Sequence, residues 1–156
     1  MLPVLQYGPS AAGGGSYWTV ASWYFVGSSV YYTSPITVSV GDPLNGVIAL
    51  TDVHPTNSTS YYDYSASFKN ISDTTLVVRN TVQLIWAALA LESYNVKPNT
   101  PQDYPPGLTV FYPTNISLSP MVKWTPQSHE DVTTTVNVDG PTNSEITFQY
   151  PYNSSV

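Results

Sequence analysis

Few residues of this chain have side chains that can take part in acid–base or metal chemistry. Charged residues make up 9% of the sequence, which contains two histidines and no cysteine. His54 and His129 each stand alone in a polar segment that contains proline, whereas a metal needs several ligands close together. We therefore expect both histidines to be surface residues. The sequence predicts no metal site, no cofactor and no disulfide.

Acidic residues outnumber basic ones, which limits the partners of the protein. Ten Asp and Glu against four Lys and Arg give a net charge of -6 and an isoelectric point near 4.4. Such a surface does not attract nucleic acid or an anionic membrane. No stretch approaches the roughly 18 apolar residues of a membrane-spanning helix. The many Tyr, Thr, Ser, Asn, Pro and Val residues are typical of a secreted all-β protein.

Four Asn-x-Ser/Thr sequons favour the same interpretation. They lie beside expected turns or strand ends and begin at Asn57, Asn70, Asn115 and Asn153. We interpret them as glycosylation sites of an extracellular protein. Because no secretory leader begins the sequence, we expect a mature or incomplete N-terminus.

The stretch Tyr17–Val26 is the element around which we expect the fold to form. It contains no Gly, Pro or charged residue, and it holds two of the four tryptophans. Aromatic and β-branched residues suit a strand, in which alternate side chains share a face. Both faces are apolar or aromatic, so we expect a central strand with one face on the core and the other lining a groove.

Other strands are predicted from apolar alternation between turns. We expect them at Met1–Gly8, Val30–Thr33, Ser34–Val40, Gly46–Val53, Tyr61–Lys69, Thr75–Arg79, Leu108–Tyr112, Ile116–Leu118, Val122–Trp124, Val132–Val138 and Ser144–Tyr150. Polar or proline-rich loops are expected at Ser10–Ser16, His54–Ser60 and Asn95–Gly107. Gln83–Glu92 is rich in helix formers, but its all-β context favours a strand. The 156 residues are predicted to form one domain, an antiparallel two-sheet β-sandwich.

Taken in order, several of these segments resemble the glutamic peptidases called eqolisins, acid-acting peptidases secreted by fungi. Val4–Gly8 is similar to the segment that carries the family's catalytic glutamine, here Gln6. The most similar segment is Ser34–Asp42, which matches a family Ser-x-Ile-x-Ile-x-x-Gly-Asp run. The remaining similar segments are Ser22–Tyr24, Ser65–Asn70, and Trp86 with Glu92-Ser93. The resemblance implies a jelly-roll sandwich of the concanavalin A-like kind, with a ligand groove on its concave face.

This chain departs from the family at the position before Trp86. The family has its catalytic glutamate there, which acts as general base on a water while the glutamine amide holds the oxyanion. Here the position is Ile85, which can neither accept a proton nor orient water. On a strand, Ile85 would face with Gln83, and Glu92 would point to the opposite side. Loss of a general base costs on the order of 10²–10⁴-fold in rate.

The second departure is at the start of the chain. The family has further strands before its glutamine, and here that glutamine is residue 6. Without those strands a sheet edge beside Met1–Gly8 is exposed, and exposed edges tend to pair with another chain. We expect a second copy, a separate N-terminal fragment or a rearranged loop to cover it.

Three functions remain open. The favoured one is a secreted, catalytically inactive relative that binds peptide or glycan in an aromatic groove. Its contacts would come from Trp18, Trp23, Tyr24 and Gln83, for which core or rim packing is the alternative. Gln6 would then serve the groove or simply satisfy strand backbone as a buried amide. The second function is an active acid endopeptidase that uses Gln6 and another carboxylate. The third is a structural, storage or lectin-like protein.

Overall fold

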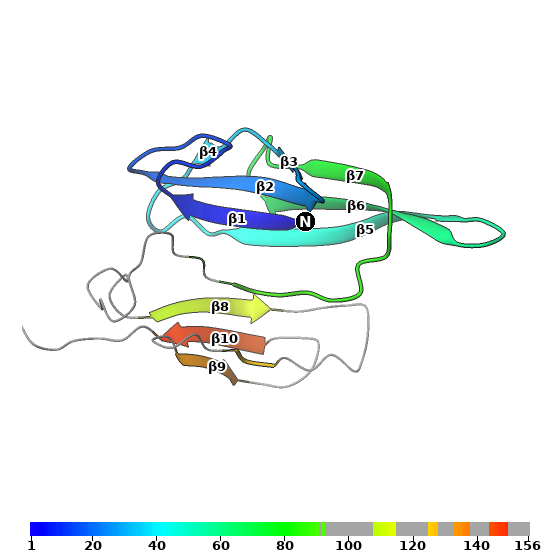
Figure 1. Cartoon of the computed structure of the whole chain (residues 1–156). Helices are drawn as coiled ribbons and strands as arrows, with labels where there is room; N and C mark the ends of the chain where they lie inside the picture. Colours follow the sequence, from blue (N-terminus) through cyan, green and yellow to red (C-terminus); the bar gives the residue numbers. More distant parts are fainter. Residues whose placement is uncertain (91, 93–107, 115–124, 128–132, 138–143, 150–156) are drawn as a thin grey trace, which may run out of the picture. The chain divides into compact units, whose positions relative to one another are not determined.

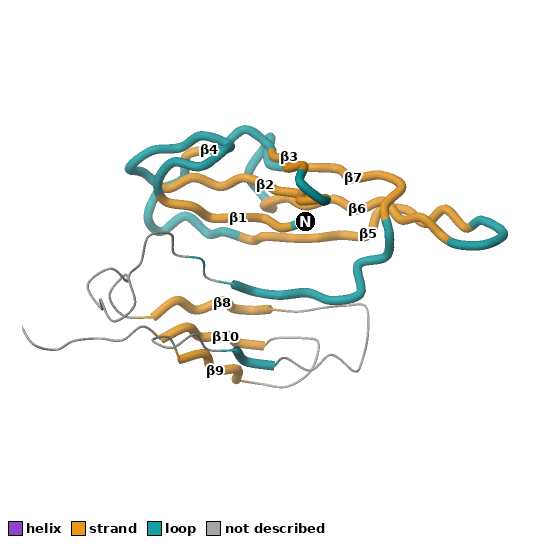
Figure 2. The backbone as a smooth tube through the Cα atoms, in the orientation of Figure 1, coloured by secondary structure: helices purple, strands orange, loops and turns teal. Residues whose placement is uncertain are grey.

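The computed structural model describes residues 1–90, 92, 108–114, 125–127, 133–137 and 144–149. The chain divides into two compact units, Met1–Ala87 and Ala88–Val156. The described part of both units is built from antiparallel strands and contains no helix (Figures 1 and 2). The all-β prediction is therefore confirmed, whereas the expectation of one domain stays a prediction. Among the described residues, no helix is long and apolar enough to cross a membrane.

The first sheet of unit Met1–Ala87 is organised around one strand, as the sequence predicts. Its strands are β1 (Leu2–Tyr7), β2 (Trp18–Val26), β3 (Ser29–Tyr32) and β4 (Ile36–Thr37). Strand β2 pairs with β1 along one edge and with β3 and β4 along the other. In the described part of the chain, β1 pairs with β2 alone, so its other edge has no strand partner there. What covers that edge stays a prediction.

The second sheet of this unit consists of β5 (Asn45–Pro55), β6 (Ser60–Lys69) and β7 (Leu76–Thr81). Strand β6 lies in the middle and pairs with β5 over almost its whole length (Figure 1). A register shift follows Leu50 in β5, and another interrupts the pairing of β6 with β7 between Tyr62 and Tyr64. Such irregularities change which side chains face a given side of a sheet.

The two sheets of this unit share an apolar cluster. Val20 of β2 is buried together with Val38 and Phe68, and the half-buried side chains of Ile36, Leu44 and Ile71 pack against them. Even-numbered residues of β2 therefore face the second sheet, because alternate side chains of a strand share a face. At the edges, Pro3 of β1 lies so close to Gly46 of β5 that a Cβ there would meet the proline ring at 2.8 Å.

Unit Ala88–Val156 contains a sheet of β8 (Leu108–Thr114), β9 (Thr133–Asn137) and β10 (Ser144–Gln149). Strand β10 lies between β8 and β9, and both pairings are antiparallel. Ile146 and Phe148 of β10 are buried, and Phe148 meets Phe111 of β8 edge to face at 5.9 Å. These three strands are present at the places that apolar alternation predicts.

Three sequence-based boundaries are wrong. Of Ser34–Val40 only Ile36–Thr37 is a strand, although Val38 still packs in the core. His54 belongs to β5 and not to a loop, because Pro55 is tolerated at the end of a strand on a sheet edge. Gln83–Glu92 is not a strand: residues 83–90 and 92 have no regular structure. The expected strands Ile116–Leu118 and Val122–Trp124 and the expected loop Asn95–Gly107 lie outside the described residues.

The strand expected at Gln83–Glu92 does not form, and the reason lies at the end of β7. Asn80 has a left-handed backbone, with φ of 53°, and its N–H donates to the side chain of Asp63. The pairing of β7 with β6 ends at Thr81, and the N–H of Leu84 donates to the hydroxyl of Tyr64 at 3.1 Å. The chain therefore leaves the sheet before Gln83. The alternation of faces that we expected for Ile85 does not apply.

Candidate functional site

The side chain of Gln6 holds the loop that connects β1 to β2. Its Nε2 donates to the carbonyl oxygens of Gly8 at 3.2 Å and Gly13 at 3.0 Å. Its Oε1 accepts a hydrogen bond from the hydroxyl of Ser10 at 3.1 Å. Main-chain hydrogen bonds join Gly8 to Gly15 at the base of the expected loop and Ser10 to Gly13, in both directions, nearer its tip. We call residues Gly8–Gly15 the glycine loop.

Gly14 allows this close packing. Its φ is 105°, in the left-handed region that favours glycine. A Cβ at this position would lie 2.7 Å from the carbonyl oxygen of Gly8 and 2.8 Å from Nε2 of Gln6. The run of three glycines therefore has a structural reason: the main chain passes directly over the Gln6 amide.

Within the described residues, the Gln6 amide is engaged by main chain and by Ser10. Both protons of its nitrogen are directed at main-chain carbonyls, and its hydrogen bonds within the described residues include no carboxylate. Ile85 is 83% exposed, as part of the segment that belongs to no strand. The amide is half-buried and holds carbonyls of a loop, whereas the structural alternative expected a buried amide on strand backbone. Its catalytic role stays a prediction.

Aromatic rings gather on the same face of the first sheet as Gln6. In the ladders, Gln6 lies opposite Thr19, and Trp23 lies opposite Tyr32. Odd-numbered residues of β2 share this face, so Phe25 joins Trp23 and Tyr32. The Trp23 ring lies 5.8 Å from Phe25 at an interplanar angle of 10°, and 5.0 Å from Tyr32. We call Trp23, Phe25 and Tyr32 the aromatic cluster.

Burial differs sharply within the aromatic cluster. Trp23 is 8% exposed, and its buried indole N–H has no hydrogen-bond partner among the described residues. Phe25 is 52% exposed and Tyr32 is 42% exposed. Trp23 therefore forms the buried floor of the aromatic cluster, while the rings of Phe25 and Tyr32 on either side of it are exposed to solvent.

The other predicted contact residues lie elsewhere. Trp18 is on the opposite face of β2, where its ring meets Tyr7 at 5.2 Å. Tyr24 is also on that face, and its hydroxyl pairs with the hydroxyl of Thr81 at 3.2 Å. Gln83 lies beyond β7, beside the turn between β5 and β6. The structure thus brings Gln6 and Trp23 to one face and places Trp18, Tyr24 and Gln83 outside it.

A buried carboxylate that the sequence reasoning missed is Asp63 of β6. It is 3% exposed, and its Oδ1 accepts a hydrogen bond from the main-chain N–H of Asn80 at 2.8 Å and pairs with Nε2 of His54 at 3.2 Å. Its Oδ2 pairs with Arg79 at 3.4 Å. Asp52 lies 4.0 Å from the same histidine nitrogen. One signal in the sequence could have indicated it: Asp63 lies between two tyrosines, in a strand that was expected to be apolar on one face.

The surroundings of Asp63 favour its charged form. The hydrogen bond from Asn80, followed by the hydrogen bond and charge of His54 and the charge of Arg79, lowers the pKa of the Asp63 carboxyl. Desolvation by burial opposes these effects but does not outweigh them. His54 is thus no isolated surface histidine. Among the described residues, no group of three His, Cys, Asp or Glu is arranged to hold a metal ion.

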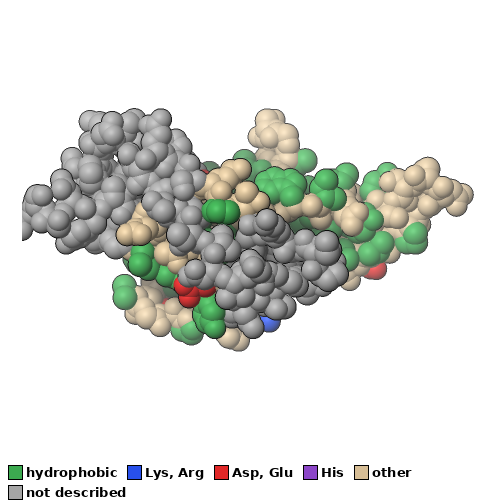
Figure 3. All heavy atoms as spheres, turned by 90° about the horizontal axis from the view of Figure 1, so that it is seen from below, with side chains coloured by type: hydrophobic (Ala, Val, Ile, Leu, Met, Phe, Trp, Pro, Cys, Tyr) green, Lys and Arg blue, Asp and Glu red, His purple; other side chains and the backbone are tan. Residues whose placement is uncertain are grey.

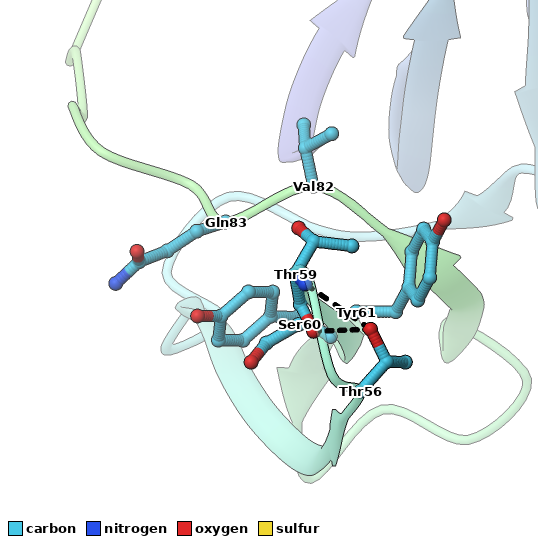
Figure 4. A pocket seen from close by; sticks show the side chains of 7 residues that line it. Thr56, Thr59, Ser60, Tyr61, Val82 and Gln83 are labelled. Atoms are coloured by element: carbon cyan, nitrogen blue, oxygen red, sulfur yellow. Dashed lines mark hydrogen bonds between the residues drawn. The ribbon is translucent and has the colours of Figure 1, made fainter.

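A hollow of about 550 Å³ lies beside the turn between β5 and β6 (Figure 4). Its lining residues are Thr56, Thr59, Ser60, Tyr61, Tyr62, Val82 and Gln83. None of these side chains is charged. Figure 4 shows Thr56, Thr59 and Tyr61 gathered at the turn, whereas the amide of Gln83 points away from it.

Two of the four sequons lie in the described residues. Asn57 is exposed in the turn between β5 and β6, and Asn70 is exposed after β6 with a left-handed φ of 69°. Both positions agree with the expected turns. Asn115 and Asn153 lie outside the described residues.

Comparison of the chain with protein-family models, with curated proteins and with solved structures gave no match. The resemblance to glutamic peptidases therefore depends on the quoted residues alone.

Proposed function

We propose that this protein is a secreted, non-catalytic β-sheet protein that binds a neutral glycan against its aromatic cluster. In this proposal its two N-terminal sheets are the layers of a sandwich of the glutamic-peptidase kind. The observation that carries the proposal is the group of three contacting rings, two of them half-exposed, on one sheet face. Aromatic rings offer a sugar a large apolar contact at low entropic cost.

The absence of charge around the aromatic cluster supports a neutral ligand. The first charged side chain in the sequence is Asp42, so β1, β2, β3 and β4 carry none. Figure 3, which views one side of the molecule, shows acidic and basic side chains scattered among hydrophobic and uncharged ones on its described surface, in agreement with the 9% of charged residues. A charged ligand would find no counter-charge on these strands, whereas tyrosine hydroxyls and ring faces suit hydroxyl-rich sugars.

The state of Gln6 supports a function without catalysis. An oxyanion-stabilising amide must direct its N–H groups at the substrate, but those of Gln6 are directed at Gly8 and Gly13. The position that holds the base in the family is an exposed isoleucine. Neither half of the peptidase pair is thus available in this arrangement.

Binding to an array of neutral oligosaccharides, followed by tryptophan fluorescence titration, tests the proposal. We expect Phe25→Ala to weaken binding about five- to tenfold, because loss of a stacked ring costs about 1.0–1.4 kcal/mol. Tyr31→Ala is the matched control: it removes an equally exposed ring of β3 that faces the other side. Trp23→Ala is unsuitable, since Trp23 is buried. Equal losses in both variants, or binding of peptides alone, contradict the proposal.

A second measurement tests the absence of catalysis. The protein is incubated with a denatured protein substrate at about pH 2–5, where a carboxylate-based peptidase would act, in the presence of pepstatin. We expect no cleavage above the level of a Gln6→Ala variant. Robust cleavage that disappears in this variant would show instead that the protein is an active acid peptidase.

A further inference from the structure

The turn between β5 and β6 is firmly held, although its residues are exposed. The Thr56 hydroxyl donates to the carbonyl oxygen of Thr59 at 2.7 Å and accepts from the N–H of Thr59 at 3.1 Å. The main-chain N–H of Thr56 donates to the same carbonyl at 2.8 Å. Asn57 is thus held in a defined exposed turn, and with Ser58 and Thr59 it forms a sequon.

The hollow beside this turn has the composition of a sugar site. Its volume of about 550 Å³ lies within the roughly 300–1,000 Å³ of small-molecule sites. It is lined by hydroxyls, one amide and two tyrosines, with no charged side chain. Thr56 and Thr59 both line it, and Asn57 lies between them in the chain. A sugar attached to Asn57 would therefore begin at the rim of the hollow.

We propose that Asn57 carries an N-glycan whose first N-acetylglucosamine lies in this hollow against Tyr61. The hydroxyls of Thr59 and Ser60 are placed to meet the polar groups of that sugar, and the Tyr61 ring, half-exposed in the protein alone, is covered by it. The glycan then acts as a structural part of the hairpin. This inference requires passage through a secretory pathway, but not the glycan-binding function of the aromatic cluster.

Asn70 provides the internal comparison. It too is an exposed sequon asparagine, but it follows β6 and precedes Ile71, which packs on the apolar cluster. Neither chain neighbour of Asn70 lines the hollow, whereas Asn57 directly follows Thr56, which does. A glycan at Asn70 is expected to extend into solvent and to leave the stability unchanged.

The test uses the whole chain produced in a eukaryotic secretory host. Mass spectrometry measures occupancy at both sequons, and an endoglycosidase then trims each glycan to one N-acetylglucosamine. We expect an occupied Asn57 whose single sugar raises the melting temperature by about 2–4 °C over Asn57→Gln. In Tyr61→Ala the same comparison should show no gain, and Ser72→Ala, which removes the sequon of Asn70 but keeps its left-handed asparagine, should match the parent protein.

Three results would overturn this inference. One is an unoccupied Asn57. Another is an occupied Asn57 whose sugar leaves the melting temperature unchanged. The third is an equal gain in the Tyr61→Ala background, which would show that the sugar acts without contacting the ring. Failure here would not affect sugar binding by Phe25, which is measured on the Asn57→Gln protein.

Discussion

Gln6 and Asp63 do the same structural work in the two sheets of the N-terminal unit, but with opposite chemistry. Each is a polar side chain on a strand, and each holds a neighbouring stretch of main chain. Gln6 donates to the carbonyls of the glycine loop, whereas Asp63 accepts from the N–H of Asn80 and pairs with the cation of Arg79. The residue expected to be catalytic and the carboxylate that the sequence did not single out are thus both anchors of main chain.

The difference between them is their response to pH. An amide has no charge to lose, so the glycine loop is held equally in acid and at neutrality. The pKa of Asp63 in the folded protein is below its ordinary value of 3.8. Its contribution to stability is therefore present above that ordinary value and is lost as the pH falls through the folded pKa. Acid should loosen the end of β7 while leaving the glycine loop in place.

The largest effect is expected for Asp63→Ala. It removes the acceptor of the Asn80 N–H and leaves Arg79 and His54 without their buried partner. Hydrogen bonds accepted by a charged group contribute more than neutral ones, and several are lost together, so we expect the melting temperature to fall by more than about 5 °C. Thermal unfolding followed by circular dichroism measures this. Asp52→Ala, an exposed member of the same group, is the control, and a similar fall in both variants would show that Asp63 is no anchor.

Gly14→Ala disturbs the contacts of the Gln6 amide with the glycine loop. The new Cβ would lie within 2.8 Å of both the Gly8 carbonyl and the Gln6 amide, in addition to the strain of its φ of 105°. We expect a loss of about 2–4 kcal/mol in the free energy of unfolding. Gly41→Ala has nearly the same φ, 95°, but nothing lies within 4 Å of its Cβ, so it should lose only about 1–2 kcal/mol. Equal losses would mean that contact with Gln6 is unimportant.

Gln6→Glu and Asp63→Asn should give opposite pH profiles. The carboxylate introduced by Gln6→Glu would, when ionised, face the carbonyls of Gly8 and Gly13 with no proton to donate, so its folded pKa should be raised. Gln6→Glu should thus lose about 1–3 kcal/mol near neutral pH and recover part of it as the pH falls from the raised folded pKa to the ordinary pKa of a glutamate. Asp63→Asn should instead lose stability near neutral pH and remove part of the acid-induced fall of the parent. Urea unfolding from acid to neutral pH compares them, and parallel profiles would refute the distinction.

The smallest effect is expected for Tyr64→Phe. It deletes the hydroxyl that accepts the N–H of Leu84, at the point where the chain leaves β7. A single lost hydrogen bond of this kind costs about 1 kcal/mol. Hydrogen exchange at Leu84 should accelerate in this variant but not in Tyr24→Phe, whose hydroxyl pairs with Thr81 instead. Unchanged exchange at Leu84 would show that Asp63 alone fixes this exit.

Most strands could be predicted because apolar alternation is a local property of the sequence. Strand β2 was recognisable as central from its two apolar faces, and β10 from the alternation of Ile146 and Phe148. The end of β7 was not predictable in the same way. It depends on Asn80 adopting a left-handed backbone against a carboxylate from another strand, and no local pattern indicates that pairing.

The candidate site was predictable only in part for a related reason. That Gln6 shares a face with Trp23 follows from the register of β1 on β2, which the glycine loop determines. That loop is itself determined by the Gln6 side chain, so neither can be derived before the other. Tyr24 and Trp18 were placed in the groove by residue type, although their even numbers put them on the opposite face from Trp23.

The hairpin of β5 and β6 also has a consequence for how the chain folds. Its strands pair from Asn45 with Lys69 to Pro55 with Ser60, and only the turn at Thr56–Thr59 separates them. Closing so short a connection costs little chain entropy, whereas β1 meets β2 only after the longer glycine loop is closed. The hairpin should therefore form early and serve as the template on which the N-terminal strands assemble. Stopped-flow kinetics would then show slower refolding for changes at Thr56 and mainly faster unfolding for changes at Gly14.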